Sequence, residues 1–133
     1  GGISGHAGLF SNAEDIAKLS KLFLQNGTYQ GRRYLKKNII NTFTSKIRNP
    51  VISDRALGWD TPSKNGTSSA GDHFSNSTYG HLGFTGTSLW IDPKNQIIMI
   101  LLTNRTYPSR EKKGIYHIRR NLHNTAMQKI LGE

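Results

Sequence analysis

The stretch from about Ser77 to Asn104 constrains the fold of this chain more than any other part of the sequence. It predicts one strand that ends in a glycine-punctuated segment, then a second strand that runs into the turn Asp92-Pro93-Lys94-Asn95. A third strand follows from Gln96 to Thr103 and carries the longest apolar run. Because this run does not alternate with polar residues, we expect both faces of the third strand to be covered and the strand to be central in its sheet.

Two glycines, Gly83 and Gly86, lie between the first two of these strands. Glycine weakens a strand because it has no side chain to pack, so its presence needs a reason such as a bulge or a second molecule approaching the main chain. We therefore expect backbone amides of this segment to face a substrate.

Two helices are predicted before the sheet. Ser11 and Glu14 match a capping box, and the helix behind them has one apolar stripe and ends at Gly27. A second helix is predicted from about Lys36 to Lys46, since Asn49-Pro50 disfavours helical geometry beyond it. The residues expected to be buried are Ile16, Leu19 and Phe23 in the first helix, and Ile39, Ile40, Phe43 and Ile47 in the second.

The other segments are predicted to be a terminal helix, loops and short β elements. After Pro108, apolar residues recur at helical spacing and predict a helix that covers one face of the sheet, with Ser109 as its N-cap. Residues 28–35 predict a short irregular or β excursion, and residues 56–60 a short strand. Residues 61–77, rich in Ser, Gly, Asn and Thr, predict a long exposed loop. The apolar positions of the terminal helix are Ile115, Ile118, Leu122, Ala126 and Ile130.

The composition limits the class of protein. Only 35% of the 133 residues are apolar, which is lean for an isolated domain and suits one that packs against something else. The longest apolar run is far shorter than the roughly 20 residues of a transmembrane helix. There are no cysteines, so disulfides and thiolate metal sites are excluded, and His117 and His123 lack the spacing for one metal on a helix face. We expect no cofactor and no metal.

The charge is strongly basic, with 18 Lys and Arg residues against 8 acidic residues and a formal net charge of +10. Half of this excess falls in the last 29 residues of the sequence. The terminal helix predicted in this basic region could bind an anionic partner, or could simply present a solvated basic face. We favour the solvated face, and a nucleic-acid partner is unlikely on this sequence, because the usual nucleic-acid modules are missing.

Several short motifs follow one another in an order that is typical of a known family. The central one is Gly80-His81-Leu82-Gly83-Phe84-Thr85-Gly86, followed by Asp92-Pro93 and Thr103-Asn104-Arg105. Ahead of it come Gly5-His6-Ala7-Gly8-Leu9-Phe10-Ser11 and Leu57-Gly58-Trp59. This order resembles the C-terminal part of the serine β-lactamase and penicillin-binding-protein superfamily, and most of all the class C β-lactamase-like esterases and peptidases.

The resemblance implies hydrolysis of amides or esters through an acyl-enzyme. The signatures of that family are Ser-x-x-Lys, Tyr-x-Asn (or Ser-x-Asn) and Lys-Thr-Gly, the last often His-x-Gly, which His81-Leu82-Gly83 fits. By resemblance, His81 lies beside the nucleophile, and the Phe84 amide, freed from the sheet ladder beside Gly83, forms half of the oxyanion hole. The neighbouring residues Leu82, Thr85 and Gly86 are then expected to contact the substrate.

The chain departs from the family pattern because it contains no Tyr-x-Asn. Ser109-Arg110-Glu111-Lys112 spells Ser-x-x-Lys, but it follows the His-x-Gly motif, whereas the nucleophile of the family precedes it. Ser63-Lys64-Asn65 matches Ser-x-Asn in an unsuitable place, the long loop, and His6 is expected to have a structural role. We therefore expect the nucleophile, its lysine and the tyrosine to lie upstream of Gly1, and this chain alone to be inactive.

Together these observations predict an α+β fold, a partial β-lactamase-like fold with an antiparallel sheet of about three strands. Residues 1–133 are expected to form one C-terminal fragment, with a helical part at 1–50 and the sheet plus terminal helix at 51–133. The expected partners are the upstream part of the parent domain, a small-molecule or peptide substrate, and a second copy bound through an exposed sheet edge or apolar patch. The alternatives are a small basic binding domain and a non-catalytic remnant. The resemblance alone suggests a periplasmic or secreted location.

Overall fold

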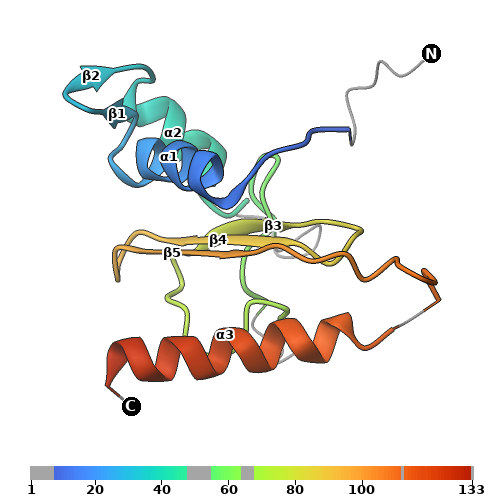
Figure 1. Ribbon diagram of the computed structural model, residues 1–133. Helices are drawn as coiled ribbons and strands as arrows, with labels where there is room; N and C mark the ends of the chain where they lie inside the picture. Colours follow the sequence, from blue (N-terminus) through green and yellow to red (C-terminus); the bar gives the residue numbers. More distant parts are fainter. Residues whose placement is uncertain (1–7, 48–54, 64–67, 112, 133) are drawn as a thin grey trace.

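The computed structural model describes residues 8–47, 55–63, 68–111 and 113–132. They form an α+β fold of three layers: a helical layer, a sheet, and a layer made of one long helix and a loop (Figure 1). The elements are α1 (Ala13–Leu24), β1 (Thr28–Tyr29), β2 (Arg32–Arg33), α2 (Lys37–Thr44), β3 (Tyr79–Leu82), β4 (Ser88–Asp92), β5 (Ile97–Leu101) and α3 (Ile115–Leu131).

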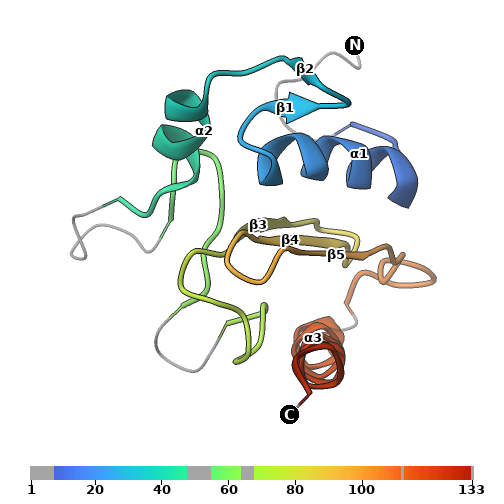
Figure 2. The ribbon, with the colours of Figure 1, turned by 90° about the vertical axis from the view of Figure 1, so that its left-hand side faces the viewer.

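The sheet is antiparallel with the order β3-β4-β5, which confirms the predicted unit of three strands. Figure 2 looks along the strands and places α1 on one face of the sheet and α3 on the other. Both faces of β5 are therefore covered, as its unbroken apolar run predicts. The prediction that β5 is central was wrong, because among the described residues β5 pairs only with β4 and forms an edge. Apolar residues on both faces of a strand indicate that other layers cover those faces. They do not indicate that the strand has a neighbouring strand on each side.

The turn between β4 and β5 depends on a buried carboxylate, that of Asp92. Its oxygens accept hydrogen bonds from the amide and hydroxyl of Ser75 and from the amide and side chain of Asn95. Although burial opposes ionisation, the hydrogen bonds from Ser75 and Asn95 outweigh it and lower the pKa of Asp92. Asp92 thus joins the β4–β5 turn to the loop that precedes β3.

The first helix begins one residue later than the capping box predicts. The N-cap is Asn12, whose side chain accepts a hydrogen bond of 2.9 Å from the amide of Asp15. At the other end, Asn26 has a φ of 54°, and the Gly27 amide donates to the Leu22 carbonyl over 2.8 Å. This is a Schellman motif, in which Asn26 takes the left-handed position and Gly27 follows it.

The second helix and the hairpin before it complete the upper layer. Strands β1 and β2 pair around Gln30 and Gly31, which both have positive φ. The predicted β excursion is therefore a hairpin with a two-residue turn. Helix α2 is shorter than predicted, and of its apolar residues only Ile40 is buried, whereas Ile39 and Phe43 are exposed. It ends at Thr44, two residues before the predicted end at Lys46, and Asn49-Pro50 lies outside the described residues.

Helix α3 buries a different face from the one predicted. The buried residues are Arg119, His123 and Met127, while Ile118 is 56% exposed and Leu122 42%. Each buried position follows a predicted one by one residue, which corresponds to a rotation of about 100°. The helix also begins later than predicted: its N-cap is Gly114, and Ser109 lies before the helix. The apolar stripe therefore did not decide which face packs.

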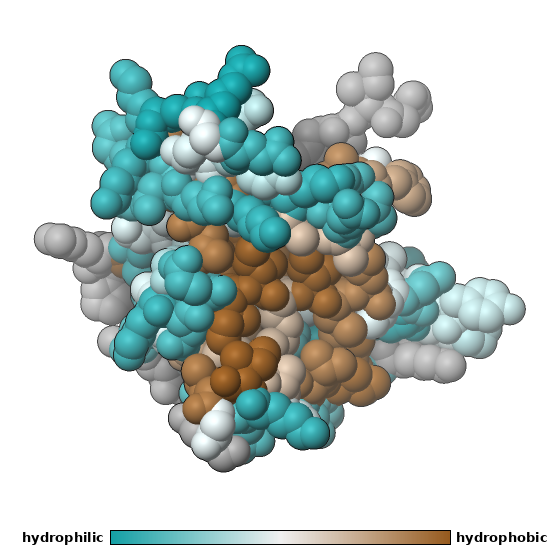
Figure 3. Space-filling view, turned by 60° about the vertical axis from the view of Figure 1, so that its left-hand side comes forward, coloured by the Kyte–Doolittle hydropathy of each residue, from teal (hydrophilic) through white to brown (hydrophobic). Residues whose placement is uncertain are grey.

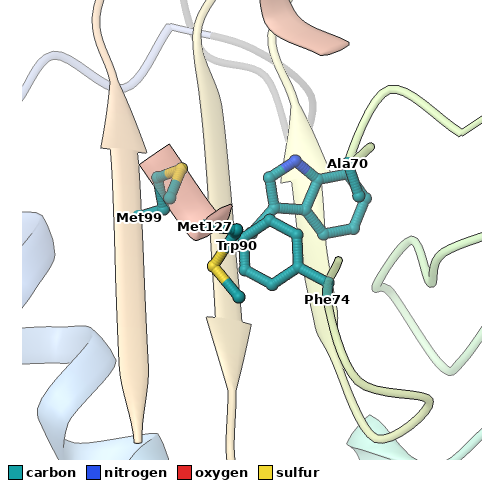
Figure 4. Packing of buried hydrophobic residues seen from close by; sticks show 5 residues of the cluster. All are labelled: Ala70, Phe74, Trp90, Met99 and Met127. Carbon is teal, nitrogen blue, oxygen red and sulfur yellow. The ribbon is translucent and has the colours of Figure 1, made fainter. Parts of the chain in front are cut away.

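The core between the sheet and α3 is one cluster, shown in Figure 4: Ala70, Phe74, Trp90, Met99 and Met127. Ala70 and Phe74 belong to the loop of residues 61–77, so the prediction that this loop is exposed was wrong for them. On the other face, the rings of Phe23, Trp59 and Tyr79 meet edge to face. In the predicted strand at 56–60, only Asp60 pairs, by a bridge to Gly80.

One side of the molecule carries a large exposed hydrophobic surface, brown in Figure 3, between two polar regions. Exposed apolar residues of α3 and of the segment after β5 are Leu102, Ile118, Leu122, Ile130 and Leu131. The surface of Figure 3 lies on the side of the open β5 edge. The sequence predicted an exposed sheet edge or an exposed apolar patch, and the described part of the chain has both.

Candidate active site

The predicted site residues lie at the turn that joins β3 to β4. The amide of Gly83 donates to the Thr87 carbonyl over 2.8 Å, and the amide of Gly86 donates to the Gly83 carbonyl over 3.0 Å. Gly86 has a φ of 99°, and neither Phe84 nor Thr85 has a positive φ. This is a type I turn followed by a glycine bulge, so the bulge that the two glycines suggested is present.

The Phe84 amide lies outside the ladder of the sheet. The last cross-strand bond before the turn uses the amide of Gly83, the residue after β3, and the next bonded amide of the turn is that of Gly86. No hydrogen bond from the Phe84 amide is found within the described part of the chain, and Phe84 is 67% exposed. A backbone donor is therefore available at the surface, at the position where the family resemblance predicts one.

The carbonyl groups of the turn are held from behind by Arg119, which reaches it from α3. Its Nη2 atom donates to the carbonyls of Gly83 and Thr87, each over 2.7 Å, and its Nε atom donates to that of Gly86 over 2.9 Å. Burial, together with the charge of Arg105, lowers the pKa of Arg119. The predicted substrate contact Gly86 is itself buried, so it lies behind the turn.

The other two carbonyls are held by Arg105 and Thr103. The Nε atom of Arg105 donates to the Phe84 carbonyl over 2.7 Å, and its backbone amide donates to the Thr85 carbonyl over 2.8 Å. The Thr103 hydroxyl also donates to the Thr85 carbonyl. The guanidinium of Arg105 lies 4.6 Å from the centre of the Phe84 ring, a cation–π contact. All five carbonyls from residue 83 to residue 87 thus have donors.

The imidazole of His81 is exposed at the same end of the sheet. Its Nδ1 atom lies 3.0 Å from the Leu82 carbonyl, which can only accept, so Nδ1 carries the proton. Its Nε2 atom then accepts from Arg55, 3.4 Å away, and Arg55 also pairs with Asp60 over 2.9 Å. Among the other predicted contacts, Leu82 is half-buried and Thr85 is exposed.

The sequence analysis missed a buried pair formed by Ser88 and His123. The Nδ1 atom of His123 donates to the Ser69 carbonyl over 2.8 Å, so its Nε2 atom accepts from the Ser88 hydroxyl. Burial lowers the pKa of His123, and the charge of Arg119 acts in the same direction, against the bond to Ser69. The pair has the atoms of a serine–histidine dyad, but neither side chain reaches solvent, so its role is structural.

Other candidates are not part of this site. The Ser109 hydroxyl accepts from the Glu111 amide over 3.2 Å, a local bond ahead of α3. His6 and Lys64-Asn65 lie outside the described residues. A cavity of about 680 Å³ adjoins Ser75 and Lys94, at the β4–β5 turn and so at the opposite end of the sheet. In the described ranges no group of three acidic or histidine side chains could hold a metal, and no helix has the length and apolarity to cross a bilayer.

Comparison with known proteins places this geometry in context. Residues 1–122 match a family model described as Beta-lactamase. An N-acetylmuramyl-L-alanine amidase of Bacillus subtilis is 40% identical over 112 residues, which are 80% of this chain and 24% of that protein. A protein of Salmonella gallinarum, provisionally named D-alanyl-D-alanine carboxypeptidase, is 40% identical over 111 residues with the same coverage. The chain thus spans about a quarter of these relatives.

A solved structure is similar in fold. A β-lactamase from Mycobacterium bovis superposes with a TM-score of 0.68, covering 90% of this chain and 44% of that one, at 18% sequence identity. At this identity the similarity concerns the fold alone. The α+β arrangement of the described residues therefore corresponds to part of a β-lactamase fold.

Proposed function

This chain belongs to the beta-lactamase family, and from that premise we propose that it is the C-terminal segment of a serine hydrolase that cleaves amides or esters through an acyl-enzyme. One observation carries the proposal: the Phe84 amide lies outside the sheet ladder, on an exposed turn whose five carbonyls all accept other donors. A fixed N–H group of this kind suits the oxygen of a tetrahedral intermediate.

The residues of the turn have distinct roles in this mechanism. Attack by a serine oxygen on the substrate carbonyl moves negative charge onto the carbonyl oxygen, and the Phe84 amide donates a hydrogen bond to that oxygen. Gly83 lets the chain leave the ladder before Phe84. His81 presents its imidazole at the same end, where it supports the hydrogen bonds around the nucleophile. Leu82 and Thr85 contact the substrate on either side of the amide.

The serine nucleophile, its lysine and the tyrosine are supplied by residues upstream of Gly1. Two observations support this. The sequence contains no Tyr-x-Asn, and its single Ser-x-x-Lys begins at Ser109, after the His-x-Gly motif. The chain also spans only about a quarter of its curated relatives. On this proposal the 133-residue chain alone does not form an acyl-enzyme.

The same upstream residues cover the open edge of β5 and the hydrophobic surface of Figure 3. An unpaired edge exposes backbone donors and acceptors, and exposed apolar residues such as Ile118 and Ile130 favour association. In the isolated chain a second copy can occupy this surface instead. Sedimentation of the 133-residue chain tests this self-association, since a monomer at all concentrations would argue against it.

The substrate class that we propose is a peptide with an alanine amide bond. The names of both relatives specify such a bond, an L-alanine amide in one and D-alanyl-D-alanine in the other. The alternative of a basic binding domain finds less support, because Arg105 and Arg119 donate to carbonyls of the turn and Arg120 pairs with Asp72. These three cations are committed to contacts within the chain.

The test compares this chain with the product of the longest reading frame that contains it. A fluorescent penicillin reports acylation as a covalent band, and release of D-alanine from a D-alanyl-D-alanine peptide reports turnover. We expect the longer protein to be labelled and the 133-residue chain to remain unlabelled. Labelling of the short chain alone would contradict the proposal, as would a longer protein without Ser-x-x-Lys upstream of Gly1.

A further inference from the structure

Arg119 is a buried cation whose position is not explained by packing. It is 7% exposed in the middle of α3, and within the described ranges no carboxylate forms a salt bridge with it. Its guanidinium instead donates to the carbonyls of Gly83, Gly86 and Thr87. Burying a charge is costly unless hydrogen bonds compensate it, and here the three carbonyls of the turn supply that compensation.

The carbonyl of Gly83 and the amide of Phe84 belong to the same peptide unit. A trans peptide is planar, and its C=O and N–H bonds point in opposite directions. When Arg119 draws the Gly83 oxygen toward α3 over 2.7 Å, it therefore points the Phe84 N–H away from α3, toward the exposed side of the turn. The Gly86 amide holds the same oxygen within the turn over 3.0 Å, so the direction of the Phe84 amide is fixed by the turn and by a side chain 35 residues later in the sequence.

We propose that Arg119 is a positioning residue, which aims the Phe84 N–H at the substrate oxygen by holding the Gly83 carbonyl; this inference rests on the proposed hydrolase function. Its second bond, to Thr87, fixes the other side of the turn, so one planar group sets both ends. Hydrogen bonds to a charged donor are stronger than neutral ones, and bonds in a chain polarise one another. The charge thereby makes the Phe84 N–H a better donor as well as an aligned one.

The role needs arginine in particular. Nη2 serves two carbonyls and Nε a third, in the fixed plane of the guanidinium. Lysine keeps the charge but places it at a single point, so it can hold one side of the turn and not both ends. Arg119→Lys is therefore expected to be intermediate between the wild type and Arg119→Met.

Arg120 provides a matched control on the same helix. Its guanidinium pairs with Asp72 over 2.5 Å and it has no bond to the turn in the described residues. Arg120→Met removes an arginine one residue away and costs stability through lost contacts with the loop of residues 68–77. Any effect that Arg119→Met has beyond this control belongs to the turn.

The experiment measures the amide and the activity separately. In the ¹⁵N spectrum, Arg119→Met is expected to shift the Phe84 amide resonance, while Arg120→Met leaves it unchanged. In the longer protein of the proposed function, Arg119→Met is expected to lower kcat by at least about tenfold and by no more than the ~10³ of complete loss of an oxyanion donor, with KM within about twofold.

The outcomes separate the two proposals. If Arg119→Met leaves the Phe84 resonance and kcat where Arg120→Met leaves them, Arg119 does not position the amide. If the resonance shifts but neither the wild type nor any variant acylates, the aiming of the amide holds and the hydrolase function fails. Should Arg119→Met not fold, Arg119→Lys decides: an amide resonance and a kcat equal to those of the wild type overturn the role.

Discussion

The hydroxyl of Ser88 donates a hydrogen bond to the Nε2 atom of His123 over 3.1 Å, at a point where both side chains are buried. Since the Nδ1 atom of His123 is bonded to the Ser69 carbonyl, the imidazole joins β4, α3 and the loop of residues 68–77 in its neutral form. The stability of the fold therefore depends on a histidine that stays uncharged.

The first prediction concerns acidification. Because burial holds the pKa of His123 below its usual value of about 6.5, the unfolded chain binds this proton more readily than the folded chain. The contribution of neutral His123 to the free energy of unfolding is then fully present above about pH 6.5. It is lost as the pH falls through the folded-state pKa. Urea midpoints measured across this range should decline in the wild type. His123→Phe should flatten the decline, and an unchanged slope would assign it to another group.

The second prediction separates the amide of Phe84 from its ring. Proline is favoured at the second position of a type I turn, so Phe84→Pro removes the N–H while the turn can form. We expect kcat of the longer protein to fall by about 10²–10³. Phe84→Ala keeps the N–H and loses only the ring under Arg105, so it should retain most of kcat. Equal losses in both variants would attribute the effect to the ring.

The third prediction concerns the bulge at Gly86. Its φ of 99° is unfavourable for any residue with a Cβ, and a Cβ at this position would meet the Thr103 hydroxyl and Ile115. Gly86→Ala should therefore lower the free energy of unfolding by more than ~1 kcal/mol. Gly114→Ala, at a position with no atom within 4 Å of the added Cβ, should be neutral or stabilising. Thermal unfolding of both variants tests the contrast.

The fourth prediction tests the buried carboxylate of Asp92. Asp92→Ala leaves the partly buried donors of Ser75 and Asn95 without this acceptor, and an unpaired buried donor costs about 1–3 kcal/mol. We expect a loss of at least ~2 kcal/mol by urea unfolding. Asp15→Ala, at an exposed carboxylate, is the control and should have little effect. Since the pKa of Asp92 is lowered from 3.8, its contribution is present above that pH and disappears as the pH falls through the folded-state value.

The fifth prediction tests which face of α3 is buried. Met127→Ala removes a fully buried side chain from the core and should cost about 2–5 kcal/mol. Ile118→Ala changes a residue that is 56% exposed and should cost no more than ~0.5 kcal/mol in the isolated chain. A larger loss of stability in Ile118→Ala than in Met127→Ala would mean that the face predicted from the sequence is the buried one. In the longer protein, Ile118→Ala should cost more, because the proposed upstream residues cover this surface.

Much of the fold could be predicted because its signals are local. Strands β3 to β5 and their turn follow from an apolar pattern interrupted by Gly83, Gly86 and Asp92-Pro93, and helices α1 and α3 follow from apolar spacing. Gly83 and Gly86 also indicated where the backbone leaves the ladder, whereas the choice of the Phe84 amide came from the resemblance to the family. These features depend on residues only a few positions apart.

The sequence by itself determined where this chain forms strands, turns and helices, and where the backbone leaves the sheet. The tertiary structure alone decided that α3 turns Arg119 and His123 inward, that β5 forms an edge, and that the loop of residues 68–77 enters the core. The physical reason is that buried carbonyls must find donors wherever the fold brings them. The bond from Arg119 to Gly83 spans 36 residues, and no pattern within one helix reports it.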